Sequence, residues 1–129
     1  MRAHRMTALK HIGPLVLYTI YIFVAGSVKG GAPPGEMSDK TAHFLAFGLM
    51  VLPALLAVRY FAPALAFPSK VALAVVAASA LGGLLEVWQL LFPWRSSELL
   101  DWVADIVGAV SVGLLVAAVR AVTPWGARP

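Results

Sequence analysis

Side chains able to bind ligands or transfer protons recur at helical spacing in three apolar stretches of this chain. Residues three or four apart on a helix share a face, so each pair can act together. Carboxylates beside an imidazole serve acid–base chemistry or hold a metal ion, and cationic side chains bind anionic groups. The candidate ligand-binding residues are Asp39, Lys40, His43, Glu86, Gln89, Arg95, Asp101 and Asp105.

The pair Asp39 and His43 opens one apolar stretch, directly after Ser38. Ser38 is an expected helix N-cap, and Asp39 suits the positive end of the helix dipole. We expect the Asp39 carboxylate to lie beside the His43 imidazole and fix its tautomer. The alternative is a capping aspartate and an interfacial histidine with no further role.

The pair Glu86 and Gln89 lies near the end of the next stretch, with Glu86 about two turns inside it. A carboxylate in the hydrocarbon region costs a few kcal/mol, about 2.5–3.5 on insertion scales, so it must face a partner, the bundle interior or water. The alternative to a functional role is a glutamate that only joins helices.

The last stretch begins with Asp101 and Asp105, which share a face. Arg95, in the preceding loop, is the expected partner of the deeper Asp105. Gly108 continues this face and leaves room for a close neighbour. All three helices therefore bring polar groups to the same side of the membrane, which predicts one site open to the outer leaflet.

The elements that position these residues are four apolar stretches, at about residues 12–28, 41–58, 71–92 and 100–119. Each is long enough to cross a bilayer as a helix, and 60% of the chain is hydrophobic while 12% is charged. The sequence thus predicts an all-α membrane protein, one domain over residues 1–129 that folds as a four-transmembrane-helix bundle. With no cysteine, thiolate metal sites and disulfides are excluded.

Glycine and proline separate these stretches. Residues 30–35 read Gly-Gly-Ala-Pro-Pro-Gly, Pro63 and Pro68 fall between the second and third stretch, and Pro53 predicts a kink inside the second. The basic start of the first stretch, followed by Ala25-Gly26-Ser27, resembles a signal peptide. We expect it to be retained as a helix.

The cations predict the orientation, because cytoplasmic loops of membrane proteins carry an excess of Lys and Arg. With both termini cytoplasmic, seven of the ten cations fall inside: Arg2, Arg5, Lys10, Arg59, Lys70, Arg120 and Arg128. Lys29, Lys40 and Arg95 fall outside. The net charge of +4 therefore reflects topology in a lipid bilayer and predicts no nucleic-acid partner.

The aromatic residues also fit a membrane protein. Trp94 and Trp102 lie where an outer aromatic belt is expected, and Trp125 lies where an inner one is expected. Tyr18 and Tyr21 are expected to pack between helices.

The ordered set of motifs over residues 38–113 resembles the VanZ-like family. In this family an Asp-Lys pair and a His-Phe pair open one helix, and a Glu and a Gln three residues apart end the next. An Arg in the following loop precedes an Asp, then an Asn or Asp, and then a Gly in the last helix. The matching residues in this chain are Asp39, Lys40, His43, Phe44, Glu86, Gln89, Arg95, Asp101, Asp105 and Gly108. Asp105 departs from the family, where Asn is more common. The resemblance implies a multi-pass protein of the bacterial inner membrane, in a family named for an accessory protein linked to teicoplanin resistance.

Four functions compete. The first is binding of an envelope component, such as a lipid-linked precursor headgroup, or of a lipophilic glycopeptide. The second is a membrane enzyme in which the candidate catalytic residues His43, Glu86, Asp101 and Asp105 form an acid–base set or hold a divalent metal ion; no organic cofactor is predicted. The third is a proton-coupled transporter, which at this size would need to form a homo-oligomer. The last is a bundle whose polar groups only stabilise helix contacts.

Overall fold

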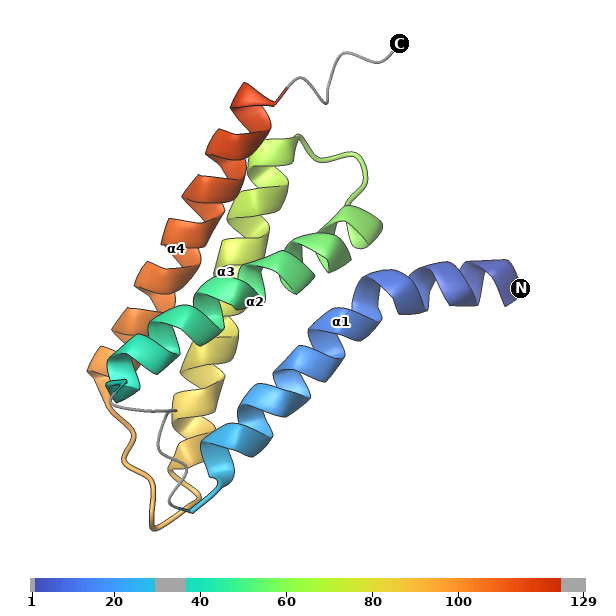
Figure 1. Cartoon of the computed structure of the whole chain (residues 1–129). Coiled ribbons are helices and arrows are strands. Elements are labelled where there is room, and N and C mark those ends of the chain that lie inside the picture. The colour runs from blue at the N-terminus through green and yellow to red at the C-terminus, as the bar shows by residue number, and fades with distance from the viewer. Residues whose placement is uncertain (1, 30–36, 124–129) are drawn as a thin grey trace.

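Four long helices make up the structure, a computed structural model that describes residues 2–29 and 37–123, without the side chains of residues 2–5. They are α1 (Arg2–Ser27), α2 (Asp39–Phe61), α3 (Phe67–Gln89) and α4 (Leu99–Val122) (Figure 1). All four are long and apolar enough to cross a membrane. The predicted all-α fold with four spans is confirmed, while the membrane side of the termini stays a prediction.

The helix boundaries follow local chemistry. The Ser38 hydroxyl accepts the Thr41 N–H at 3.2 Å, which confirms Ser38 as the N-cap of α2. The prediction that Pro68 lies in a linker is wrong, because it falls in the first turn of α3. The N–H that proline lacks has no helical partner there, so proline is tolerated. Pro53 lies inside α2, which continues to Phe61.

Some predictions fall on residues outside the described ranges. These include the linker at residues 30–35 and the interfacial role of Trp125.

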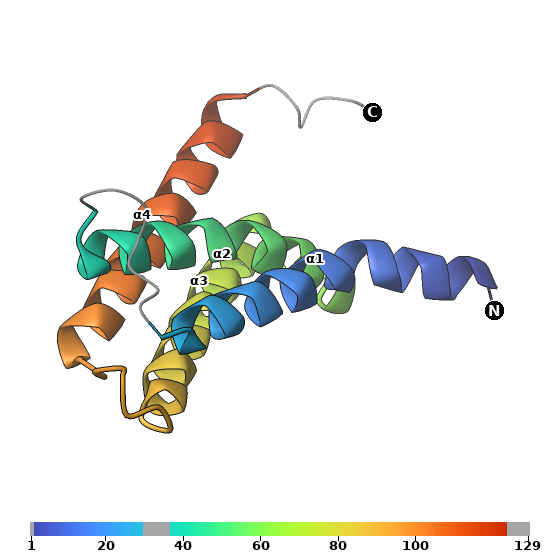
Figure 2. The same cartoon turned by 60° about the horizontal axis from the view of Figure 1, so that its bottom comes forward.

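Helices α2, α3 and α4 pack against one another, and α1 packs mainly against α2 and more lightly against α3. Figures 1 and 2 show α1 diverging from α3 and α4 towards the N-terminus. It stays beside α2, where the rings of His11 and Tyr60 stack with their centroids 5.5 Å apart. The end of α1, the start of α2, the end of α3 and the start of α4 lie together (Figure 1). We call this the polar end of the bundle.

The apolar core lies between α2, α3 and α4. Residues on one face of α2, at helical spacing, are almost fully buried: Phe47, Met50, Val51 and Ala54. Small residues of the neighbouring helices meet them, namely Ala74 and Ala78 of α3 and Ala109 of α4. The outward faces carry exposed Leu and Val, as lipid contact requires.

Glycines bring α2 and α4 into close contact near the polar end. A Cβ on Gly108 of α4 would overlap the backbone carbonyl of Phe44 on α2. A Cβ on Gly48 of α2 would in turn lie 3.1 Å from the carbonyl oxygen of Gly108. Small residues at such contacts allow helix backbones to approach closely. The space expected beside Gly108 is therefore filled by α2 itself.

Replacing Gly108 by alanine should force α4 away from α2, because the obstacle is backbone rather than a flexible side chain. We expect Gly108→Ala to lower the free energy of unfolding by about 1–3 kcal/mol, the usual cost of overpacking. Gly13→Ala on α1 is the matched control, since its Cβ would lie 3.8 Å from Leu9. Thermal unfolding in detergent should give a lower midpoint for Gly108→Ala than for Gly13→Ala. Equal unfolding midpoints for the two variants would refute the close contact between α2 and α4.

Candidate functional site

The centre of the polar end is a buried contact between His43 of α2 and Asp105 of α4. His43 Nδ1 lies 2.9 Å from Asp105 Oδ1, the distance of a hydrogen bond from imidazole to carboxylate. Both side chains are buried, and Asp105 has no exposed surface. Gly82 of α3 makes room for Asp105, because a Cβ there would overlap the carboxylate. The contact therefore depends on a small residue in a third helix.

Glu86 of α3 is the third member of this buried group. Its Oε1 lies 3.8 Å from His43 Nδ1 and has no hydrogen-bond partner among the described residues. Its Oε2 accepts the Ser97 hydroxyl at 3.1 Å and the Glu98 N–H at 3.0 Å. The loop before α4 thus holds the carboxylate in place while one oxygen stays unpartnered beside the imidazole.

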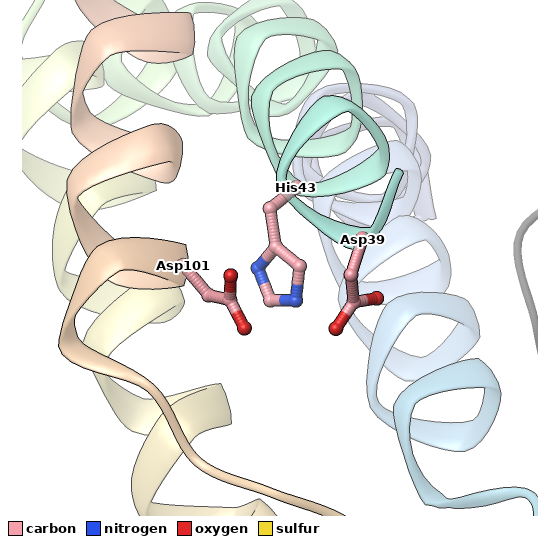
Figure 3. Close-up of side chains that lie close together, drawn as sticks. All are labelled: Asp39, His43 and Asp101. Carbon is pink, nitrogen blue, oxygen red and sulfur yellow. The ribbon is translucent and has the colours of Figure 1, made fainter. Parts of the chain in front are cut away.

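An ion pair borders the buried group. Lys40 Nζ lies 3.0 Å from Glu98 Oε2 and 3.4 Å from Asp101 Oδ1. Lys40 and Glu98 are exposed, whereas Asp101 is buried and its Oδ1 lacks a well-aligned hydrogen bond. Figure 3 shows the His43 ring between the Asp39 and Asp101 carboxylates. The starts of α2 and α4 are thus joined by the exposed ion pair of Lys40 with Glu98 and by the buried hydrogen bond of His43 with Asp105.

Two groups within the described residues have the residue types and spacing to hold a metal ion. They are His43, Glu86 and Asp105, which are all buried, and Asp39, His43 and Asp101, of which Asp39 lies at the surface. In each group the ligand atoms lie within 4.8 Å of one another. Because both groups use His43, they represent alternative positions for an ion.

A cavity of about 540 Å³ lies beside the buried group around His43, between α1 and the helices α2 and α3. Most of its wall is apolar, with Ile22, Phe47 and Leu85 among the lining residues. Polar groups gather at the polar end of the bundle: Asp39, His43, Gln89 and Arg95. The cavity therefore has an apolar body and a polar end.

Two of these polar groups lack partners among the described residues. Gln89 is 1% exposed, and neither its amide nitrogen nor its amide oxygen has a hydrogen-bond partner. Arg95 Nε is also buried without a partner. Buried polar groups are normally satisfied, so unpartnered donors that line a cavity indicate a ligand or bound water.

All eight predicted ligand-binding residues lie at the polar end, although their role in binding stays a prediction. One predicted pairing is wrong. Asp105 pairs with His43 and not with Arg95, because Arg95 lines the cavity on the α1 side. Asp39 does lie beside His43, with ligand atoms within 4.8 Å of each other. The hydrogen bond of His43 Nδ1 nevertheless goes to Asp105, because α4 approaches α2 so closely at Gly108.

Sequence reasoning missed three contributors to this site. Ser97 and Glu98 orient Glu86, and Gly82 accommodates Asp105. Polar residues directly before a predicted helix are common hydrogen-bond partners, which was the available signal for Ser97 and Glu98. The packing role expected for the two tyrosines is found for only one of them. The Tyr18 hydroxyl donates to the Ala46 carbonyl of α2 at 2.9 Å, whereas Tyr21 is mostly exposed.

Neither a family model, nor a curated protein, nor a solved structure matches this chain.

The buried contact between His43 and Asp105 should show energetic coupling. In a double-mutant cycle with His43→Gln and Asp105→Asn, we expect a coupling free energy of about 0.6–1.7 kcal/mol, between the average and the maximum that such cycles give for hydrogen bonds between membrane helices. The cycle of Lys40→Gln with Glu98→Gln is the control, because water screens that exposed pair. Reversible unfolding in mixed micelles measures both, and a coupling no larger than that of the surface pair would contradict the assignment.

Proposed function

We propose that this chain is a VanZ-like membrane protein that binds an anionic amphiphile of the cell envelope in the cavity between α1 and the rest of the bundle. The observation that carries the proposal is the cavity itself. It joins an apolar wall to donors of Gln89 and Arg95 that have no partner within the part of the chain that the structure describes.

The apolar wall fits the chain of a lipid-like molecule. Leu45 of α2 and Tyr21 of α1 are exposed residues of the lining, and they lie on surfaces that face lipid in a bilayer. Because these exposed residues line the cavity, a ligand can enter it sideways from the membrane. Apolar pockets with a few placed polar groups are the usual form of small-molecule sites.

The polar end fits an anionic headgroup with donor groups of its own. Arg95 supplies a guanidinium, which pairs well with phosphate or carboxylate. Gln89 supplies an amide that donates and accepts, and Asp39 supplies an acceptor for hydroxyl or amine groups. A phosphorylated or sugar-bearing lipid precursor carries both kinds of group.

The charge distribution and the resemblance support the proposed membrane setting. The seven cations assigned inside favour cytoplasmic termini. The polar end then faces the outer side of a bacterial inner membrane, where lipid-linked precursors and glycopeptides meet. The family resemblance adds teicoplanin as a candidate ligand, since that glycopeptide carries a lipid chain.

A transport role receives less support from the described residues. The buried polar side chains are His43, Glu86, Gln89, Asp101 and Asp105, and all lie at the polar end. A proton or solute path needs polar steps through the whole thickness of the membrane. A binding site open to one side needs only this end.

Binding can be measured with purified protein in micelles and three probes: a polyprenyl phosphate, the matching polyprenyl alcohol and inorganic phosphate. We expect the polyprenyl phosphate to bind most tightly, because it alone has both a chain and an anion. Arg95→Gln should weaken its binding about 10-fold to 100-fold, the loss of one charge-assisted hydrogen bond. Arg59→Gln, at the other end of α2, is the matched control and should bind as wild type does. If the polyprenyl phosphate and the polyprenyl alcohol bound with equal affinity, the site would not recognise an anionic headgroup and the proposal would be refuted.

The resistance role is tested in cells. Wild type and Glu86→Gln are expressed at matched membrane levels in a susceptible bacterial host, and the inhibitory concentrations of teicoplanin and vancomycin are compared. We expect wild type to protect selectively against teicoplanin and Glu86→Gln to lose that protection, because the Glu86 carboxylate lies 3.8 Å from His43, which lines the cavity. Unchanged susceptibility with wild type would remove resistance from the proposal and leave envelope-lipid binding standing.

A further inference from the structure

The group of His43, Glu86 and Asp105 contains two buried carboxylates that do not line the proposed amphiphile cavity. Glu86 is 7% exposed and Asp105 0% exposed. The nearby ammonium of Lys40 faces Glu98 and Asp101 instead. The histidine is then the nearest cationic partner for two carboxylates in an apolar bundle. Buried charges of this kind are normally paired or bound to a metal ion.

The unpartnered oxygen of Glu86 is aimed at the imidazole. Its Oε1 lies 3.8 Å from His43 Nδ1, too far for a hydrogen bond, and it is buried without a partner in residues 2–29 and 37–123. On the other side, Asp105 Oδ1 lies 2.9 Å from the same nitrogen. Ligands about 2.0–2.2 Å from a metal ion lie roughly 3.0–3.6 Å apart. The three ligand atoms therefore need only small shifts to surround one ion.

The surroundings already orient one ligand. Ser97 and the Glu98 N–H fix Oε2 of Glu86, which leaves Oε1 directed into the group. Hydrogen bonds from outside the coordination sphere commonly orient metal ligands in this way. Gly82, one turn before Glu86 on α3, leaves the space that Asp105 needs.

We propose that His43, Glu86 and Asp105 bind a divalent transition-metal ion, with Zn²⁺ or Mn²⁺ as the class that suits one imidazole and two carboxylates. Imidazole suits Zn²⁺, whereas Mg²⁺ and Ca²⁺ favour all-oxygen sites. Two carboxylates and a neutral imidazole carry a charge of −2, which a divalent ion neutralises. The ion joins α2, α3 and α4 at one point and leaves coordination positions for water or a ligand.

This site is independent of the amphiphile cavity. His43 borders both, but the other two metal ligands do not line the cavity, and Gln89 and Arg95 are not metal ligands. Metal binding measured without any lipid probe therefore tests this inference alone.

The test uses full-length protein in micelles, freed of metal with a chelator and then titrated with Co²⁺, followed by Zn²⁺ competition. We expect one Co²⁺ per chain, visible absorption bands from a nitrogen–oxygen site, and displacement by one equivalent of Zn²⁺. Glu86→Gln should weaken binding by more than about 100-fold, because it removes a direct ligand rather than a supporting group. Glutamine has the size of glutamate and can still accept from Ser97 and the Glu98 N–H.

Two control variants locate the ion. Glu98→Gln makes the same chemical change as Glu86→Gln but keeps the backbone N–H that orients Glu86, so its affinity should equal that of wild type. Asp39→Asn should also bind normally, because Asp39 belongs only to the alternative group with Asp101. Loss of binding in Asp39→Asn with normal binding in Glu86→Gln would overturn the proposed location.

Folding is checked by thermal unfolding without metal. Glu86→Gln should match metal-free wild type, and if it does not fold, Asp105→Asn serves as the second ligand variant with the same expected loss of affinity. In wild type, Zn²⁺ should raise the unfolding midpoint. Fewer than about 0.1 equivalents of Co²⁺ on wild type and no stabilisation by Zn²⁺ would overturn the metal site and leave a hydrogen-bonded junction of helices.

Discussion

The hydrogen bond between His43 and Asp105 joins two helices at the point where their backbones come closest. In a bilayer no water is available to solvate these groups, so each must find its partner within the bundle. Gly108 allows α2 to approach α4, and Gly82 leaves space for the carboxylate from α3. With this contact made, Glu86 meets the same imidazole from the third helix. The polar end thus depends on close backbone packing as much as on its charged residues.

The polar end has two parts with different chemistry. The buried group around His43 is rich in acceptors and short of cations, which favours a metal ion. The cavity beside it offers the donors of Gln89 and Arg95 and an apolar wall, which favours an anionic amphiphile. His43 borders both parts, so an ion held there would lie near a bound headgroup. The proposed binding function and the proposed metal site therefore share one residue while remaining separately testable.

The number of helices and the end at which the polar residues gather could be predicted, because apolar length and helical spacing are local properties of the sequence. The pairing of those residues could not, because it depends on how helices approach one another. Arg95 precedes Asp105 closely in the chain, yet Asp105 contacts His43, which is 62 residues away. That contact depends on the missing side chain of Gly108, which the sequence shows only as space for some neighbour. The cavity was also not predictable, because the first stretch carries no motif that indicates how it packs against α2 and α3.

The central claim is that an anionic amphiphile lies between α1 and α2 with its headgroup at Arg95. Photo-crosslinking tests it most directly, with a polyprenyl phosphate that carries a diazirine on its chain and protein reconstituted in nanodiscs, followed by mass-spectrometric mapping. The account predicts adducts concentrated on the cavity wall, at residues such as Tyr21 and Leu45, and reduced in Arg95→Gln. Adducts spread evenly over the lipid-facing surface, with Leu114 of α4 labelled as strongly and no effect of Arg95→Gln, would contradict it.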